Sequence, residues 1–99
     1  MENEHDISLS EAAVMTGAYR TANPGKLIGG LFTKEAVELV LDQPLCTSFR
    51  YYFALKANGD QTIVLVGVDA AGNDLVNGQL ADSAKPCPPF QGNSNVLNS

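Results

Sequence analysis

Two apolar segments joined by Asn58-Gly59 constrain the fold of this chain more than any other feature. Large apolar residues occupy every second position of the first segment: Phe49, Tyr51, Phe53 and Leu55. This period of two is typical of a half-buried β-strand. The second segment, residues 61–68, is rich in valine, and Asn-Gly is the preferred pair in a two-residue type I′ turn. The sequence therefore predicts a β-hairpin over residues 49–68.

The turn determines which residues face each other in the hairpin. A two-residue turn places Phe49 opposite Val68 and Tyr51 opposite Val66, which makes one face almost wholly apolar. A three-residue loop would shift every pair by one residue, and we expect the valine-rich strand to tolerate that shift less well. The opposite face then carries Arg50, Tyr52, Ile63 and Leu65.

Two helices are predicted before the hairpin. Ser8 and Glu11 have the spacing of a capping box, so a helix is expected to begin there and to end before the breaker Asn23-Pro24-Gly25. Thr33 is a typical N-cap for a second helix, which Pro44 ends. The residues between these helices, 24–32, are interpreted as a Gly-rich connector.

The C-terminal third is predicted to add one strand and an extended segment. Residues 74–82 fit either a short third strand or a helical turn, and we favour the strand. Residues 85–90 contain three prolines and should be extended. The expected fold is α+β: two N-terminal helices packed on a small antiparallel β-meander, with an extended Pro-rich C-terminal segment. The helices are expected to cover the row from Phe49 to Leu55.

The composition is that of a small acidic domain. The chain has 99 residues, which suits a single domain over residues 1–99. We expect residues 1–6 to form a flexible acidic arm and residues 91–99 a flexible tail. Eleven acidic residues outnumber six basic ones, which gives a net charge of −5. No nucleic-acid partner is expected, because phosphate contacts need clustered Lys and Arg and the basic residues here are isolated.

Neither a membrane segment nor a signal peptide is predicted. The longest apolar run, residues 63–68, is far shorter than the ~20 residues of a membrane-spanning helix. The first residues, Met-Glu-Asn-Glu-His-Asp, lack the positive charge with which a signal peptide begins. We therefore expect no membrane insertion and a cytoplasmic location, with export by a route that needs no signal peptide left open.

No catalytic constellation, cofactor site or metal site is found in the sequence. His5 is the only histidine and lies in the predicted arm, where it cannot be held against a nucleophile. No Cys-x-x-Cys pair of zinc-ligand type occurs. Cys46 and Cys87 are interpreted as buried thiols, or as a disulfide in an oxidising compartment. We expect a protein that is not an enzyme, and catalysis by carboxylates or Cys87 is the least favoured alternative.

The face of the hairpin opposite the core has more apolar residues than two short helices can cover. Either the segment 86–90 folds back over it, or it is an interface with a second copy or another protein, formed by Tyr52, Ile63 and Leu65 with Arg50 at the rim. We therefore expect a protein-interaction module that forms a homo-oligomer through the hairpin. The alternative is a small-molecule-binding domain with a pocket between the Gly29-Gly30 connector and the aromatic strand.

Four runs of sequence carry a resemblance: Ala12-Ala13-Val14-Met15-Thr16, Tyr52-Phe53-Ala54-Leu55, residues 63–74 and Cys87-Pro88-Pro89-Phe90. In these four runs the chain resembles a group of small uncharacterised bacterial proteins. Members of that group often end in Cys-Pro-Pro-x-Cys, and here Gln91 stands where the second cysteine would be. No known function comes with the group, so the resemblance implies a single free-standing domain and nothing more.

Overall fold

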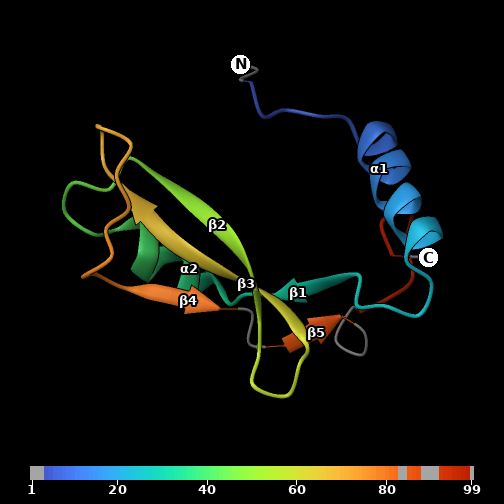
Figure 1. Cartoon of the computed structure of the whole chain (residues 1–99). Coiled ribbons are helices and arrows are strands. Elements are labelled where there is room, and N and C mark those ends of the chain that lie inside the picture. The colour runs from blue at the N-terminus through green and yellow to red at the C-terminus, as the bar shows by residue number, and fades with distance from the viewer. Residues whose placement is uncertain (1–3, 83–84, 88–91, 99) are drawn as a thin grey trace.

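The described residues form two helices and five strands arranged in two antiparallel sheets (Figure 1). Three strands form one sheet in the order β2-β3-β4: β2 (Ser48–Leu55), β3 (Gln61–Val68) and β4 (Leu80–Asp82). The second sheet pairs β1 (Gly29–Leu31) with β5 (Lys85–Cys87). The predicted α+β class and the antiparallel meander are therefore confirmed. The computed structural model describes residues 4–82, 85–87 and 92–98.

Both helices begin at the side chains that the sequence predicts. Helix α1 (Leu9–Ala22) starts after Ser8, whose hydroxyl accepts the Glu11 N–H at 3.0 Å. The Glu11 carboxylate accepts the Ser8 N–H in return at 3.3 Å, which completes the capping box. Helix α2 (Lys34–Leu41) starts after Thr33, whose hydroxyl accepts a backbone N–H of the first turn at 3.1 Å. These local signals alone fix where each helix begins.

Only α2 packs across the three-stranded sheet. Its Val40 is 1% exposed and lies at the centre of the core. Helix α1 has no buried residue, and Figure 1 places it to the side, beyond β1. Its apolar stripe stays in contact with water, with Leu9 64% and Met15 62% exposed. The predicted packing of both helices on one sheet face is thus found for α2 alone, because capping fixes where a helix starts and not what it packs against.

The predicted two-residue turn of the hairpin is wrong. The Lys56 N–H donates to the Asp60 carbonyl at 2.7 Å, and the Gly59 N–H donates to the Lys56 carbonyl at 2.9 Å. Residues 57–59 therefore form a three-residue loop in which Gly59 has φ +90°. Tyr51 pairs with Leu65 and not with Val66, so every predicted pair is shifted by one residue.

This shift exchanges the residues of β3 between the two faces of the sheet. The face toward α2 carries Phe49, Tyr51, Phe53 and Leu55 of β2 with Ile63, Leu65 and Gly67 of β3. A side chain at Gly67 would meet Gln43 Nε2 and Cys46 Sγ at 3.0 Å, which shows how closely the turn after α2 approaches this face. The opposite face carries Arg50 and Tyr52 with Val64, Val66 and Val68.

The connector and the C-terminal segments contain pairing that the sequence analysis missed. The Gly-rich connector includes strand β1, and the Ile28 N–H donates to the Cys87 carbonyl at 2.8 Å. Of the segment 85–90, residues 85–87 form β5, and the others lie outside the described residues. The favoured third strand exists as β4, although it is confined to the last part of residues 74–82. The outermost residues of the predicted arm and tail, 1–3, 91 and 99, also lie outside the described residues.

Candidate functional site

Strand β2 forms one edge of the three-stranded sheet and carries a row of exposed apolar side chains. Their exposed fractions are 48% for Phe49, 54% for Tyr51, 75% for Phe53 and 74% for Leu55. The rings of Tyr51 and Phe53 contact each other edge to face, with centroids 5.6 Å apart. We call these four residues the apolar row. Helix α2 has eight residues and is about 12 Å long, so it is too short to cover the row as well as β3.

The backbone of β2 offers hydrogen-bonding groups at the same positions. The bond from Lys56 to Asp60 shows that the even-numbered residues of β2 direct their N–H and C=O groups toward β3. The odd-numbered residues, which form the apolar row, therefore direct theirs away from β3. Within the described part of the chain, no other strand pairs with this edge. The row thus combines exposed apolar surface with backbone groups available for a further strand.

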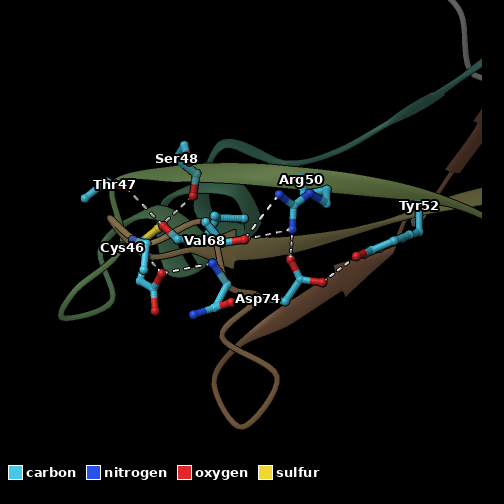
Figure 2. Close-up of polar contacts among 11 residues, drawn as sticks. Cys46, Thr47, Ser48, Arg50, Tyr52, Val68 and Asp74 are labelled. Carbon is cyan, nitrogen blue, oxygen red and sulfur yellow. Dashed lines mark hydrogen bonds and ion pairs between the residues drawn. The ribbon is translucent and has the colours of Figure 1, made fainter.

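The opposite face of the sheet is closed by a polar network (Figure 2). Arg50 Nη1 forms an ion pair with Asp74 Oδ1, and the Tyr52 hydroxyl donates to Asp74 Oδ2. Arg50 also donates to the Gly72 carbonyl at 3.4 Å from Nη2. The hydrogen bond to Asp74, followed by that to Tyr52, raises the pKa of Arg50 above its ordinary value. Both carboxylate oxygens of Asp74 are therefore engaged within the protein.

The network covers the valines of β3. Asp74 forms a bridge with Val68, whereas Arg50 pairs with Val66 from the other side. Arg50 and Tyr52 must therefore extend across β3 to reach Asp74. Val66 and Val68 are only 3% and 4% exposed, although neither described helix covers this face. Arg50 and Tyr52 thus cross this face of the sheet and bind Asp74 within the same chain.

A turn that leads from α2 into β2 exposes a further apolar side chain. The Cys46 N–H donates to the Gln43 carbonyl at 3.1 Å, which closes a tight turn. Leu45 in this turn has φ +73°, a left-handed conformation that disfavours a branched side chain. Leu45 is also 78% exposed, so it gains little from packing. The Gln43 side chain holds the same region by accepting the Gln79 N–H at 2.9 Å.

A pocket of about 320 Å³ lies between α1, the connector and the start of β3. Its lining is mainly apolar and includes Met15, Ile28 and Ile63, together with Gly29 and Gly30. The glycines of the connector therefore border a pocket, as the alternative of a small-molecule-binding domain predicts. The opposing wall comes from α1 and β3, however, and no residue of the aromatic strand β2 lines it.

The structure does not bring the four predicted interface residues together. Arg50 and Tyr52 lie on one face and bind Asp74. Leu65, at 6% exposed, belongs to the core under α2, and Ile63 is half-buried at the pocket. On strand β2 the most exposed apolar side chains are instead Phe53 and Leu55 of the apolar row, which the sequence analysis assigned to the core. The alternation identified the row, but no local signal indicated that α1 would leave it uncovered.

The remaining candidate features are the two cysteines, metal-ligand clusters and membrane-spanning helices. Cys46 and Cys87 are half-buried, and the Cys46 Sγ donates to the Ser48 carbonyl at 3.2 Å. In the described residues, no group of three or more His, Cys, Asp or Glu side chains is placed to hold a metal ion. Neither described helix has the length and apolar character needed to cross a membrane.

Comparisons with known proteins identify no relative of this chain. No family model, curated protein or solved structure matches the chain. The resemblance to the group of small bacterial proteins therefore stays a prediction.

Proposed function

We propose that the protein is a non-enzymatic interaction module that associates with copies of itself through the β2–β3 hairpin, with the apolar row as the contact surface. One observation carries this proposal: four exposed apolar side chains lie on a strand whose outer edge is unpaired within the described residues. Proteins usually cover or charge such an edge, because it is a template for pairing with another chain. A second copy would pair with the backbone groups and place its own apolar side chains beside the row.

The size of the row sets the expected strength of association. The four side chains expose roughly 400–500 Å² in each copy, and edge-to-edge pairing buries only their sides, so the buried area lies below the ~1,000 Å² lower limit for a specific interface. The part of this area that is buried and the backbone hydrogen bonds between the strands must offset about 4–15 kcal/mol for the loss of freedom on association. We therefore expect a dimer that dissociates on dilution.

Solution mass measured by light scattering over a dilution series tests this proposal. Phe53 is 75% exposed, so Phe53→Lys should leave the fold intact and give a monomer at every concentration. Val14→Lys is the matched control, because Val14 is an apolar residue of α1 that is 73% exposed. The control should associate like the wild type. A wild type that is monomeric throughout, or a Phe53→Lys variant with unchanged mass, would contradict the proposal.

A second candidate function is small-molecule binding, which the pocket beside the connector favours. Its volume of about 320 Å³ lies at the lower end of the range for ligand pockets, and its lining suits a small apolar molecule. Such a ligand should raise the melting temperature of the wild type in a screen of apolar compounds. Thr16 borders the pocket, so Thr16→Trp should fill it and abolish the shift. A screen without any shift would count against this function.

A further inference from the structure

We infer that two copies of this chain pair antiparallel through β2, around a two-fold axis that passes through Tyr52. This inference rests on the proposed self-association and adds its geometry. The outward-facing backbone groups of β2 belong to the odd-numbered residues, so these residues must form the hydrogen-bonded pairs between copies.

Symmetry restricts the registers to a small set. Paired residues of antiparallel strands have their side chains on the same face of the sheet. A two-fold axis perpendicular to the sheet keeps each face on its own side, so odd-numbered residues pair with odd-numbered ones. Two registers retain most of β2: one centred on Tyr51 and one centred on Tyr52.

The register centred on Tyr52 uses the whole apolar row. It places Phe49 opposite Leu55 of the second copy, and Tyr51 opposite Phe53 of the second copy. Each apolar side chain therefore meets another apolar side chain, and each member of the row exchanges backbone hydrogen bonds with its opposite.

The register centred on Tyr51 leaves one end of the apolar row without an apolar partner. It places Leu55 opposite Thr47 of the second copy, which lies outside β2. The Thr47 N–H already donates to the Val68 carbonyl of its own chain at 2.8 Å. Leu55 would therefore lose both an apolar neighbour and a backbone partner, which favours Tyr52 as the centre.

The charges of the edge are compatible with the register centred on Tyr52. Lys56 lies opposite Ser48 and Arg50 lies opposite Ala54, so no like charges face each other directly. Arg50 also keeps its own counter-ion, Asp74, within the same chain. The α2 helices of both copies lie on the same face of the joined sheet, where the two apolar rows become continuous.

Disulfide trapping distinguishes the two registers while leaving Arg50, Tyr52 and Asp74 in place. Even-numbered residues form the pairs that lack hydrogen bonds, whose Cα atoms are ~4.5 Å apart, and this distance suits a disulfide. In a background with Cys46→Ser and Cys87→Ser, differently tagged Ser48→Cys and Lys56→Cys chains are mixed and oxidised. A covalent dimer of these two chains reports the register centred on Tyr52. Ser48→Cys mixed with Ala54→Cys reports the register centred on Tyr51.

We expect a mixed covalent dimer from Ser48→Cys with Lys56→Cys, and only background cross-linking from Ser48→Cys with Ala54→Cys. Lys34→Cys, on a side chain that is 91% exposed on α2, measures that background. Cross-linking of the second mixture, or of neither mixture in a sample that light scattering shows to be dimeric, would overturn the register while leaving self-association intact. Loss of self-association itself is detected separately by the Phe53→Lys measurement.

Discussion

Arg50 of the edge strand β2 and Asp74 of the loop before β4 form an ion pair that crosses the face of β3. Tyr52 donates to the second oxygen of the same carboxylate. The contact joins two segments that are not neighbours in the sheet and covers Val66 and Val68 between them. The stability of this half of the fold should therefore depend on Asp74.

Replacing Asp74 by alanine should lower the free energy of unfolding by about 1–2 kcal/mol, because both an ion pair and a hydrogen bond are lost. Urea denaturation followed by circular dichroism measures this change. Asp82→Ala is the control, since Asp82 is an exposed aspartate of β4 and its loss should change stability by less than about 0.5 kcal/mol. Equal effects of the two substitutions would show that the network does not stabilise the sheet.

The contribution of Arg50 should be independent of pH near neutrality. Its pKa in the folded protein is raised above the ordinary value of arginine, chiefly by the hydrogen bond to Asp74. A raised pKa means that the stabilisation is fully present below the ordinary value and is lost only as the pH rises through the folded value. The destabilisation caused by Arg50→Met should thus be equal at about pH 6 and about pH 8. A contribution that fades between these values would require another titrating group.

Leu45→Gly should stabilise the protein by about 1 kcal/mol, because glycine adopts the left-handed conformation of this turn without strain. Little packing is lost, since Leu45 is 78% exposed. Thermal unfolding measures the gain. Leu39→Gly provides a contrast, because Leu39 is 51% exposed but lies within α2, where glycine should destabilise by about 1 kcal/mol. A destabilised Leu45→Gly variant would mean that the contacts of the leucine side chain stabilise the fold by more than the left-handed backbone conformation destabilises it.

Gly78 and Gln43 should be energetically coupled. A methyl group at Gly78 would overlap with Gln43 Oε1, the atom that accepts the Gln79 N–H. Gly78→Ala should therefore destabilise by about 1–3 kcal/mol in the wild type. In a Gln43→Ala background the overlap is absent, and the same substitution should be nearly neutral. A double-mutant cycle measures this coupling, and additive effects would contradict it.

The elements of this fold were predictable where the signal is local. Ser8 with Glu11 marks the start of α1, and the alternation from Phe49 to Leu55 marks β2, since both patterns depend on neighbouring residues only. The strands β1 and β5 have three residues each and contain glycine or proline, so they leave no periodic pattern in the sequence.

The register and the site could not be predicted because several arrangements satisfy the same residues. Gly59 is compatible with a two-residue turn and with the three-residue loop found here, since both accept a positive φ. Strand β3 has apolar residues on both faces, so a shift of one residue still buries valine or leucine. The link from Arg50 to Asp74 gave no signal, because an aspartate in this position is also typical of a plain turn.

The shortness of β4 has a consequence for assembly. A sheet made by joining two β2 strands would end on both sides in β4, which spans only Leu80–Asp82. Three residues ending in an aspartate are a poor template for another chain, since short and charged edges resist pairing. Within the described residues, joining the β2 edges would thus leave only the short β4 edges of this sheet exposed, and we expect polymerisation to stop at the dimer. The topology makes this mode of self-association self-limiting.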